Sequence, residues 1–294
     1  MSQYDEVAAK EARLLAILAG LDSVIVAYSG GVDSSLLAYY ARRVLADKAK
    51  IVIALSASLA QGELAAARRQ AALHQFDLIE IATDEVDSED YRRNDGNRCF
   101  FCKSTLFEYL QRMRQNDFAS AIAYGANMDD LDDLRPGHLA AKNYGVLAPL
   151  VDAELYKSEI RTLARRAGLT AWDRPQAACL SSRFPNFTYI TPERLSLVDK
   201  LEDTVRAAGF VQVRVRYQAE AARVSVEVGG DEVGRFREQV DLGESLKAAL
   251  LDQARAQGVE LIDIFIDPEG YLQGKANRIA SVNPEDIAGI VTDG

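Results

Sequence analysis

The chain has 294 residues and a formal net charge of −10, with 48% hydrophobic and 27% charged side chains. This length suits about two domains, and the composition is ordinary for a soluble globular protein. We find neither a membrane-spanning stretch nor the basic and apolar regions of a signal peptide, so we expect a cytoplasmic protein. Proteins that grip nucleic acid usually carry a basic face, so the acidic balance disfavours RNA or DNA and favours a small-molecule substrate.

Strands and helices alternate in the expected structure of residues 1–170. Short apolar runs predict buried strands, and the longer segments between them predict helices. The expected strands are Val24–Ala27, Lys50–Leu55, Leu78–Ala82 and Ser120–Tyr124. The expected helices are Tyr4–Ala19, Ser34–Ala46, Gly62–Gln75, Lys103–Arg114 and Lys157–Ala167. This alternation predicts the α/β class, a Rossmann-like parallel twisted sheet with helices on both faces and ligands beyond the carboxyl ends of its strands.

A glycine-rich turn, Ser29–Ser35, follows the first expected strand and precedes an apolar helix. Gly30 and Gly31 let the backbone turn sharply, and the first N–H groups of the helix attract an anion. Asp33 can hold a Mg²⁺ that neutralises phosphate. The hydroxyl donors of the turn are Ser29, Ser34 and Ser35. The alternative is an ordinary capped helix, since Asp and Ser are favoured N-caps.

The string Ser29–Ser35 resembles the PP-loop of the ATP pyrophosphatase superfamily, which includes asparagine, GMP and NAD synthetases and tRNA thiolases. The resemblance implies the PP-loop fold, cleavage of ATP between its α and β phosphates, an adenylated substrate and released pyrophosphate. The lysine of a Walker A sequence is absent, which disfavours a kinase or P-loop ATPase. In PP-loop proteins the place of Ser56, after the second expected strand, meets the adenosine.

Cys99 and Cys102 form a C-x-x-C pair. A cytosolic chain rarely keeps a structural disulfide, so a redox pair, a metal site and chance are the candidates. A zinc site would need four ligands, and beside its three cysteines the chain has only His74 and His138, which we interpret as structural. A thioredoxin-like pair fits this place in the chain poorly.

Cys179 is the third cysteine, in a stretch that also contains Arg174 and Arg183. Nearby positive charge favours the thiolate, the form that attacks or binds metal. The alternative is a small buried cysteine, a common core residue. Three cysteines also suit a [4Fe–4S] cluster whose fourth iron is open to an exogenous ligand.

The loop 174–192 breaks the alternation of strands and helices. Beyond it we expect strand Phe187–Ile190, helix Glu193–Ala208, strands Val211–Tyr217 and Arg223–Val228, helical sequence to about 256 and strand Glu260–Ile266. The order βαββαβ predicts a smaller α+β domain, of ferredoxin-like type. We therefore expect a PP-loop domain at 1–175 and a C-terminal domain for substrate binding and oligomerisation at 186–294, joined by the Cys179 loop, 176–185.

An acidic segment, Gly125–Gly137, follows the fourth expected strand. Its carboxylates can orient Mg²⁺ or hydroxyl groups, whereas the alternative is a solvated acidic loop. These carboxylates belong to Asp129, Asp130, Asp132 and Asp133. Arg135 would help to shape the turn.

Arg214 and Arg216 fall on one face of an expected strand, because side chains alternate along a strand. Two neighbouring guanidiniums repel each other, and arginine binds phosphate through bidentate hydrogen bonds. The pair therefore favours an anion site. The alternative is pairing with carboxylates such as Glu202 or Glu227.

Four segments in one chain together resemble the LarE-type sulfur transferases, and the resemblance spans nearly the whole sequence. These segments are Ser29–Ser35, Gly125–Gly137, Cys179–Phe184 and Val213–Arg216. The resemblance implies an enzyme that adenylates the carboxylates of pyridinium-3,5-biscarboxylate mononucleotide and replaces oxygen by sulfur. The resulting thiocarboxylates serve the nickel-pincer nucleotide cofactor.

The family has two branches that differ in their cysteines. In one, a cysteine matching Cys179 is a sacrificial sulfur donor that ends as dehydroalanine. In the other, two further cysteines complete a [4Fe–4S] cluster that carries an extra sulfide. With Cys99 and Cys102 present, this chain resembles the cluster branch.

The resemblance also implies ATP, Mg²⁺ and a homo-oligomer. It places Gly125, Asn127, Asp130 and Arg135 in the ATP site beside the PP-loop. It assigns Arg214 and Arg216 to the phosphate of the substrate nucleotide, with Glu202 nearby and Arg183 as a further candidate. Like Arg183, Lys103 is a candidate for phosphate or carboxylate.

Three other functions remain as alternatives. A tRNA thiolase with an iron–sulfur cluster shares the chemistry but needs a basic RNA surface, which the net charge of −10 disfavours. An ammonia-using amide synthetase would leave the cysteines incidental. A nucleotide-binding regulator would show no turnover.

Overall fold

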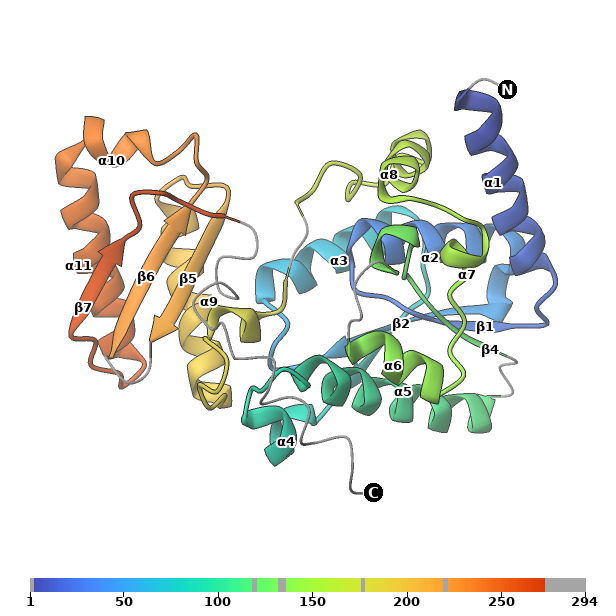
Figure 1. Ribbon diagram of the computed structural model, residues 1–294, viewed down its shortest axis with the longest axis horizontal. Helices are drawn as coiled ribbons and strands as arrows, with labels where there is room; N and C mark the ends of the chain where they lie inside the picture. The colour runs from blue at the N-terminus through green and yellow to red at the C-terminus, as the bar shows by residue number, and fades with distance from the viewer. Residues whose placement is uncertain (1–2, 118–120, 132–135, 176–177, 219–221, 273–294) are drawn as a thin grey trace, which may run out of the picture. The chain divides into compact units, whose positions relative to one another are not determined.

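The computed structural model describes residues 3–117, 121–131, 136–175, 178–218 and 222–272 (Figure 1). It divides into two compact units. Unit 1 comprises Met1–Arg92 and Gly96–Ala178, and unit 2 comprises Arg93–Asp95 and Cys179–Gly294. Within the described residues, no helix has the length and hydropathy needed to span a bilayer.

Unit 1 contains a parallel four-stranded sheet in the order β3-β2-β1-β4. Its strands are β1 (Val24–Ala27), β2 (Ala49–Leu55), β3 (Leu78–Ala82) and β4 (Ala121–Tyr124). The chain moves outward from β1 to β3 and then returns to place β4 on the other side of β1. The direction of winding thus reverses between β1 and β4, and ligands of open α/β sheets bind at such a reversal.

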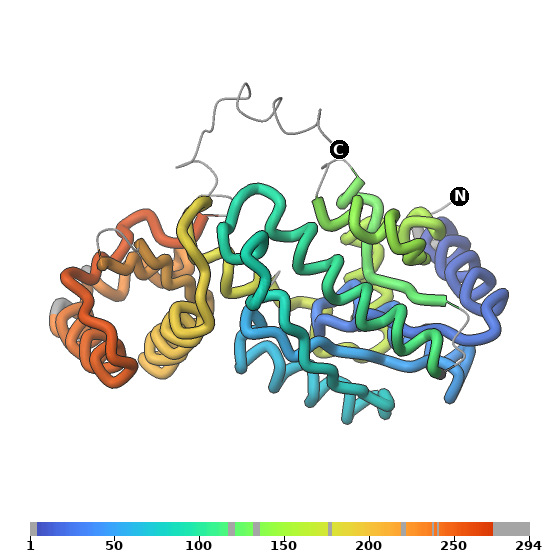
Figure 2. Tube along the Cα trace, turned by 90° about the horizontal axis from the view of Figure 1, so that it is seen from below, coloured from blue at the N-terminus to red at the C-terminus, as the bar shows by residue number. Residues whose placement is uncertain are grey.

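Helices cover both faces of this sheet (Figures 1 and 2), which confirms the expected α/β fold class. A large core cluster on one face includes Leu14, Leu36 and Ile160, and a smaller cluster on the other face includes Phe107 and Ala140. The helices of unit 1 are α1 (Gln3–Ala19), α2 (Val32–Leu45), α3 (Gln61–Leu73), α4 (Glu89–Arg92), α5 (Arg98–Asp117), α6 (Pro136–Asn143), α7 (Pro149–Asp152) and α8 (Lys157–Arg166). The short 3-10 turns of the chain are η1 (Ala46–Lys48), η2 (Glu85–Asp87), η3 (Met128–Asp130) and η4 (Leu180–Arg183).

Several helices of unit 1 differ from the expectation: the short helices α4 and α7 were not expected, and α5 and α6 differ in ways that bear on the site. Helix α5 begins at Arg98 rather than Lys103, so both cysteines of the C-x-x-C pair lie at the N-terminal end of the helix. Phe100 explains the extension, because it packs against the smaller core cluster and so favours a helical start. Helix α6 was not expected, although its Ala140 and Ala141 are buried against the same cluster.

Unit 2 contains a three-stranded sheet in the order β5-β6-β7. Strands β5 and β6 are antiparallel, whereas β6 and β7 are parallel. These strands are β5 (Val213–Gln218), β6 (Arg223–Val228) and β7 (Asp263–Ile266), and the helices of the unit are α9 (Pro192–Ala207), α10 (Gly234–Glu238) and α11 (Val240–Ala256).

The expected strand Phe187–Ile190 is wrong. Phe187 has a φ of +67°, in the left-handed region, and its side chain is 65% exposed. The N–H of Thr188 donates to the carbonyl of Pro185, which makes this segment a turn. The apolar and β-branched residues suggested a strand, but the left-handed backbone ends any extended run. The described residues of unit 2 therefore have the order αββααβ, not the ferredoxin-like βαββαβ.

Two glycines allow close backbone approach around the turn after β1. Gly30 has a φ of +76°, and a Cβ there would lie 2.8 Å from the Cβ of Ala67. Gly125, just after β4, lies so close to α2 that a Cβ would come within 2.7 Å of the Ser34 nitrogen. The end of β4 and the first turn of α2 therefore touch through backbone, which only glycine permits.

We predict that Gly125→Ala destabilises unit 1 by about 1–3 kcal/mol, because the added methyl group meets backbone rather than a movable side chain. Urea unfolding followed by the fluorescence of Trp172, the only tryptophan and a neighbour of the unit 1 core, measures this. The control is Gly62→Ala in α3, where a Cβ meets nothing within 4 Å and alanine should stabilise the helix by up to about 1 kcal/mol. Equal stability of Gly125→Ala and the wild type would contradict the prediction.

Candidate functional site

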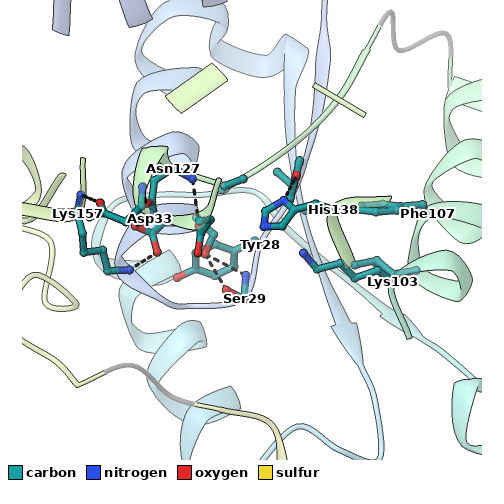
Figure 3. A pocket seen from close by; sticks show the side chains of 16 residues that line it. Tyr28, Ser29, Asp33, Lys103, Phe107, Asn127, His138 and Lys157 are labelled. Atoms are coloured by element: carbon teal, nitrogen blue, oxygen red, sulfur yellow. Dashed lines mark hydrogen bonds and ion pairs between the residues drawn. The ribbon is translucent and has the colours of Figure 1, made fainter. Parts of the chain in front are cut away.

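A cavity of about 360 Å³ lies in unit 1 beyond the carboxyl ends of β1 and β4 (Figure 3). It occupies the reversal point of the sheet, where a ligand is expected. The turn after β1, the segment after β4 and helices α5, α6 and α8 all contribute to its walls. The polar side chains nearest the turn are Ser29, Asp33, Ser34, Asn127, Asp130 and Lys157.

Hydrogen bonds hold the turn after β1 in shape. The hydroxyl of Ser34 donates to the carbonyl of Gly31 at 3.1 Å and accepts from the N–H of Ser29 at 3.1 Å. The two serine hydroxyl oxygens are 3.0 Å apart. Gly31 is the N-cap of α2 and no side chain caps it, so the alternative of an Asp or Ser cap is wrong. The first N–H groups of α2 thus lack a side-chain cap, as an anion site requires.

Asp33 projects from the first turn of α2 into the cavity. Its Oδ1 accepts a 3.3 Å hydrogen bond from Asn127, and its Oδ2 forms an ion pair with Nζ of Lys157. Burial raises the pKa of Asp33, Lys157 opposes the increase and the nearby Asp130 adds to it, so that the pKa lies above its ordinary value. Burial therefore disfavours the charged form of Asp33, and a nearby cation such as Lys157 stabilises it.

The segment after β4 is ordered by its own polar side chains. The Asn127 side chain accepts from the N–H of Asp129 at 2.9 Å, and Asp130 accepts from the N–H of Asn127 at 3.2 Å. Asp129 in turn accepts from the N–H of Lys157 at 2.6 Å. Asp129 and Asp130 are thus not simply parts of a solvated loop. Asp132, Asp133 and Arg135 lie outside the described residues.

The other end of the cavity is aromatic. The hydroxyl oxygen of Tyr124 lies 2.8 Å from Nδ1 of His138, and Nζ of Lys103 lies 4.8 Å from the centre of the Tyr124 ring. Burial, with a contribution from Asp130, raises the pKa of Tyr124 to about 12, so the phenol stays protonated. His138, interpreted from the sequence as structural, therefore lines the candidate site. Only the unexpected helix α6 brings it there.

Some predicted ATP-site residues do not line this cavity. Gly30 and Gly31 shape the backbone of the turn, and Ser35 is fully buried on α2. Ser56, at the end of β2, hydrogen-bonds to Glu85, and its hydroxyl oxygen is 2.8 Å from that of Ser58. The cavity thus belongs to the β1–β4 side of the turn, away from Ser56 at the end of β2.

All three cysteines are thiols. Cys99 is exposed and Cys102 is half-buried at the N-terminal end of α5, whereas Cys179 is exposed at the N-cap of η4 in unit 2. Within the part of the chain that the structure describes, no three His, Cys, Asp or Glu side chains are arranged to hold a metal ion.

Arg183 and Glu202 form a buried ion pair in unit 2. Nε and Nη2 of Arg183 donate to the two carboxylate oxygens at 2.7 and 3.0 Å, and the side chains are 3% and 0% exposed. Glu202 also accepts from Arg206 at 2.7 Å and from the N–H of Val215 at 3.1 Å. Both oxygens of Glu202 thus have partners within unit 2, and its predicted place beside a substrate phosphate stays a prediction.

The same pair holds the backbone next to the third cysteine. Nη1 of Arg183 donates to the carbonyl of Cys179 at 3.1 Å and to the Ser182 hydroxyl at 3.0 Å. Arg183 therefore spans from Glu202, on α9, to the start of η4. Its position fixes the start of the Cys179 loop, and its predicted contact with phosphate stays a prediction.

Arg214 and Arg216 lie on one face of β5, as the alternation predicted. Arg216 pairs with Glu227 at 2.6 Å, the alternative weighed from the sequence, and also donates to the carbonyl of Ser182. The guanidinium of Arg214 lies 5.2 Å from the centre of the Tyr271 ring, and burial together with the charge of Arg183 lowers its pKa. A second cavity, of about 290 Å³, lies in unit 2 against Arg216 and Glu227.

The chain was compared with known proteins. No family model matches it. It is 38% identical over 259 residues to an uncharacterised protein of Synechocystis, covering 88% of this chain and 93% of that protein. It is 31% identical over 220 residues to the pyridinium-3,5-bisthiocarboxylic acid mononucleotide synthase of Lactiplantibacillus plantarum, covering 74% of this chain and 80% of that protein. An uncharacterised protein of Methanocaldococcus jannaschii is 26% identical over 204 residues.

We predict that Glu202→Gln destabilises unit 2 by about 3–5 kcal/mol, because Arg183 would stay buried without its counter-ion. Urea unfolding followed by circular dichroism measures the change. The control is Asp203→Asn, which removes an exposed partner of Arg206 and should cost no more than about 0.5 kcal/mol. Equal losses of unfolding free energy in the two variants would contradict the prediction, because the buried pair would then stabilise unit 2 no more than the exposed one.

The pH dependence of the free energy of unfolding gives a second test of the Arg183–Glu202 pair. Burial alone would raise the pKa of Glu202, but Arg183, with Arg206 and Arg214, outweighs it and lowers the pKa below the ordinary 4.5. The stability that the charged Glu202 contributes is therefore fully present above pH 4.5. It is lost as the pH falls through the lowered pKa of Glu202. We expect the stability difference between the wild type and Glu202→Gln to be constant above pH 4.5 and to narrow below it.

Proposed function

Since the chain belongs to the LarE-type family, which contains the pyridinium-3,5-bisthiocarboxylic acid mononucleotide synthase of Lactiplantibacillus plantarum, we propose that it is an ATP-dependent sulfur transferase. Its substrate would be pyridinium-3,5-biscarboxylate mononucleotide, whose carboxylates it converts to thiocarboxylates for the nickel-pincer nucleotide cofactor. The observation that carries this proposal is the likeness to that synthase. The match covers 220 residues, more than unit 1 contains, so it extends into both units.

We propose that ATP binds with its phosphates at the turn after β1. The uncapped first turn of α2 and the hydroxyls of Ser29 and Ser34 support this, because such groups donate to phosphate oxygens. Asp33 would hold Mg²⁺. This ion is usually bound by one or two carboxylates plus substrate phosphates, so a single aspartate suits it and no cage of three protein ligands is needed.

In the proposed reaction, a carboxylate oxygen of the substrate attacks the α phosphorus of ATP. The bond from that phosphorus to the β-phosphate oxygen breaks, and pyrophosphate leaves. The carboxylate oxygen then belongs to a good leaving group, AMP. A sulfur nucleophile attacks the activated carbonyl carbon, and AMP departs with the original oxygen, leaving a carbon–sulfur bond. The cations of the cavity would stabilise the charge that develops on the phosphates.

We assign the sulfur chemistry to Cys179. Its exposed side chain is open to a substrate, and Arg183 fixes its backbone. We further propose that Cys99, Cys102 and Cys179 together hold a [4Fe–4S] cluster. Such a cluster, with three thiolate ligands, leaves one iron free to carry the sulfide that is transferred. The three thiols and the spacing of two of them within one turn of α5 support this donor set.

The function is tested with the purified chain, ATP, Mg²⁺ and the biscarboxylate mononucleotide. We expect pyrophosphate and AMP to appear with the thiocarboxylate, detected by mass spectrometry, and Asp33→Asn to abolish pyrophosphate release because the metal loses its carboxylate. Asp22→Asn, which changes an exposed carboxylate outside the cavity, is the control. An amide product with ammonia, thiolation of tRNA instead of the nucleotide, or no turnover at all would each contradict the proposal.

The sulfur source is tested separately by anaerobic reconstitution with iron and sulfide. We expect about four irons per chain, lost after Cys99→Ala, Cys102→Ala or Cys179→Ala. A wild type without iron would contradict the cluster. Dehydroalanine at position 179 after turnover would then identify Cys179 as the sacrificial donor.

A further inference from the structure

Lys157 already occupies the position that a metal on Asp33 needs. Its ammonium group forms an ion pair with Oδ2 of Asp33, while Oδ1 accepts from Asn127 (Figure 3). Both oxygens of Asp33 therefore have a partner. Each oxygen keeps a further lone pair, but a metal ion bound to Oδ2 would lie against the ammonium of Lys157, and the two cations would repel each other.

The backbone of Lys157 is firmly held. Its N–H donates to Asp129 at 2.6 Å, and the N–H of Met128 donates to the carbonyl of Leu155 at 3.0 Å. Glu159 accepts from the N–H of Tyr156 at 2.9 Å and pairs with Lys10 at 2.8 Å. The start of α8 is thus tied both to the segment after β4 and to α1, so any response of Lys157 to a ligand falls on its side chain.

The side chain of Lys157 is free to reorient, whereas the carboxylate of Asp33 would be destabilised without a cation beside it. The side chain is 28% exposed, lines the cavity and ends in a flexible four-carbon stem. Asp33 is 19% exposed and stands in the first turn of α2, near a second carboxylate, Asp130. If the ammonium leaves and nothing replaces it, Asp33 becomes a poorly solvated charge without a counter-ion, which is costly.

We propose that Lys157 is the counter-ion of Asp33 before the nucleotide binds. On binding, Mg²⁺ takes the place of the Lys157 ammonium beside Asp33, and the ammonium moves to the phosphates. Lys157 is then a positioning residue for the metal and a ligand of the nucleotide. The proposal rests on the ATP use proposed above. No covalent bond changes in this exchange: Asp33 keeps one cation throughout, and the ammonium charge passes from carboxylate to phosphate oxygen.

Lys103 provides a matched comparison inside the same cavity. It is also a lysine and lines the same walls, but its ammonium lies 4.8 Å from the centre of the Tyr124 ring rather than on Asp33. Removing either lysine subtracts one positive charge from the cavity. Only the removal of Lys157 takes the counter-ion from Asp33, so the two variants separate a specific exchange from a general loss of positive charge.

The test is the affinity for α,β-methylene-ATP, which cannot be cleaved between those phosphates, measured by titration calorimetry with Mg²⁺ and with EDTA. The ratio of the two affinities gives the metal dependence of binding. In Lys157→Met without metal, the Asp33 carboxylate repels the triphosphate, so we expect that ratio to rise about tenfold above the wild type. Lys157→Arg keeps the charge and should keep the ratio.

Lys103→Met is expected to weaken binding in both conditions and to leave the ratio unchanged. An unchanged ratio in Lys157→Met, or an equal rise in Lys103→Met, would overturn the exchange. The readout involves no sulfur acceptor, so failures of the two proposals can be told apart. A wild type that binds the analogue but makes no thiocarboxylate contradicts the function alone. A wild type that makes thiocarboxylate while Lys157→Met keeps the wild-type ratio contradicts the exchange alone.

Discussion

The carboxylate of Asp33 needs a cation because it is held largely away from water, and the cavity of unit 1 is organised around that need. The first turn of α2 carries Asp33, and Gly125 lets the end of β4 touch that turn through backbone. The contact brings Asn127 within hydrogen-bonding distance of Asp33. A side chain at position 125 would push β4 and α2 apart, and the polar wall of the cavity would separate with them.

Unit 2 contains a second buried carboxylate, that of Glu202, whose partners differ from those of Asp33. Glu202 is fully buried, receives bidentate hydrogen bonds from Arg183 and also binds Arg206. Two planar guanidiniums and a backbone N–H leave no lone pair for a ligand, so this site is a fixed framework. Among the described residues, Asp33 pairs with one ammonium group, that of the flexible Lys157 side chain, and both line the cavity. A carboxylate that is neutralised by one flexible ammonium group can change partners, whereas Glu202, which is held by two arginines, cannot.

The sequence predicted the sheet of unit 1 well because its strands are short apolar runs whose identity does not depend on distant residues. Val24–Ala27 is one example, and the glycine turn after it identified the candidate site. The failure at Phe187–Ile190 has the opposite cause. Its apolar residues have strand propensity, but a left-handed residue and a hydrogen bond from Thr188 to Pro185 make it a turn.

The residues that sequence reasoning missed in the site reach it through tertiary structure. Lys157 is 124 positions from Asp33, and nothing in the local sequence of α8 distinguishes it from an ordinary helix-starting lysine. His138 depends on α6, whose short sequence gave no clear periodicity. The one available signal was the acidic composition of the segment after β4, since three aspartates around one cavity require a cation from elsewhere in the chain.

The contrast between Asp33 and Glu202 supports the roles that we propose for the two units. In the proposed reaction, adenylation needs cations that can follow a moving charge from substrate to pyrophosphate, and the exchangeable pair of unit 1 suits that step. Sulfur transfer instead needs a nucleophile at a fixed position. Arg183 binds the backbone carbonyl of Cys179, so the rigid Arg183–Glu202 pair can orient the loop while the sulfur remains exposed. An exposed thiol on a fixed backbone suits both a sulfur donor and a cluster ligand, because either role requires access from outside and a position that does not change during the reaction.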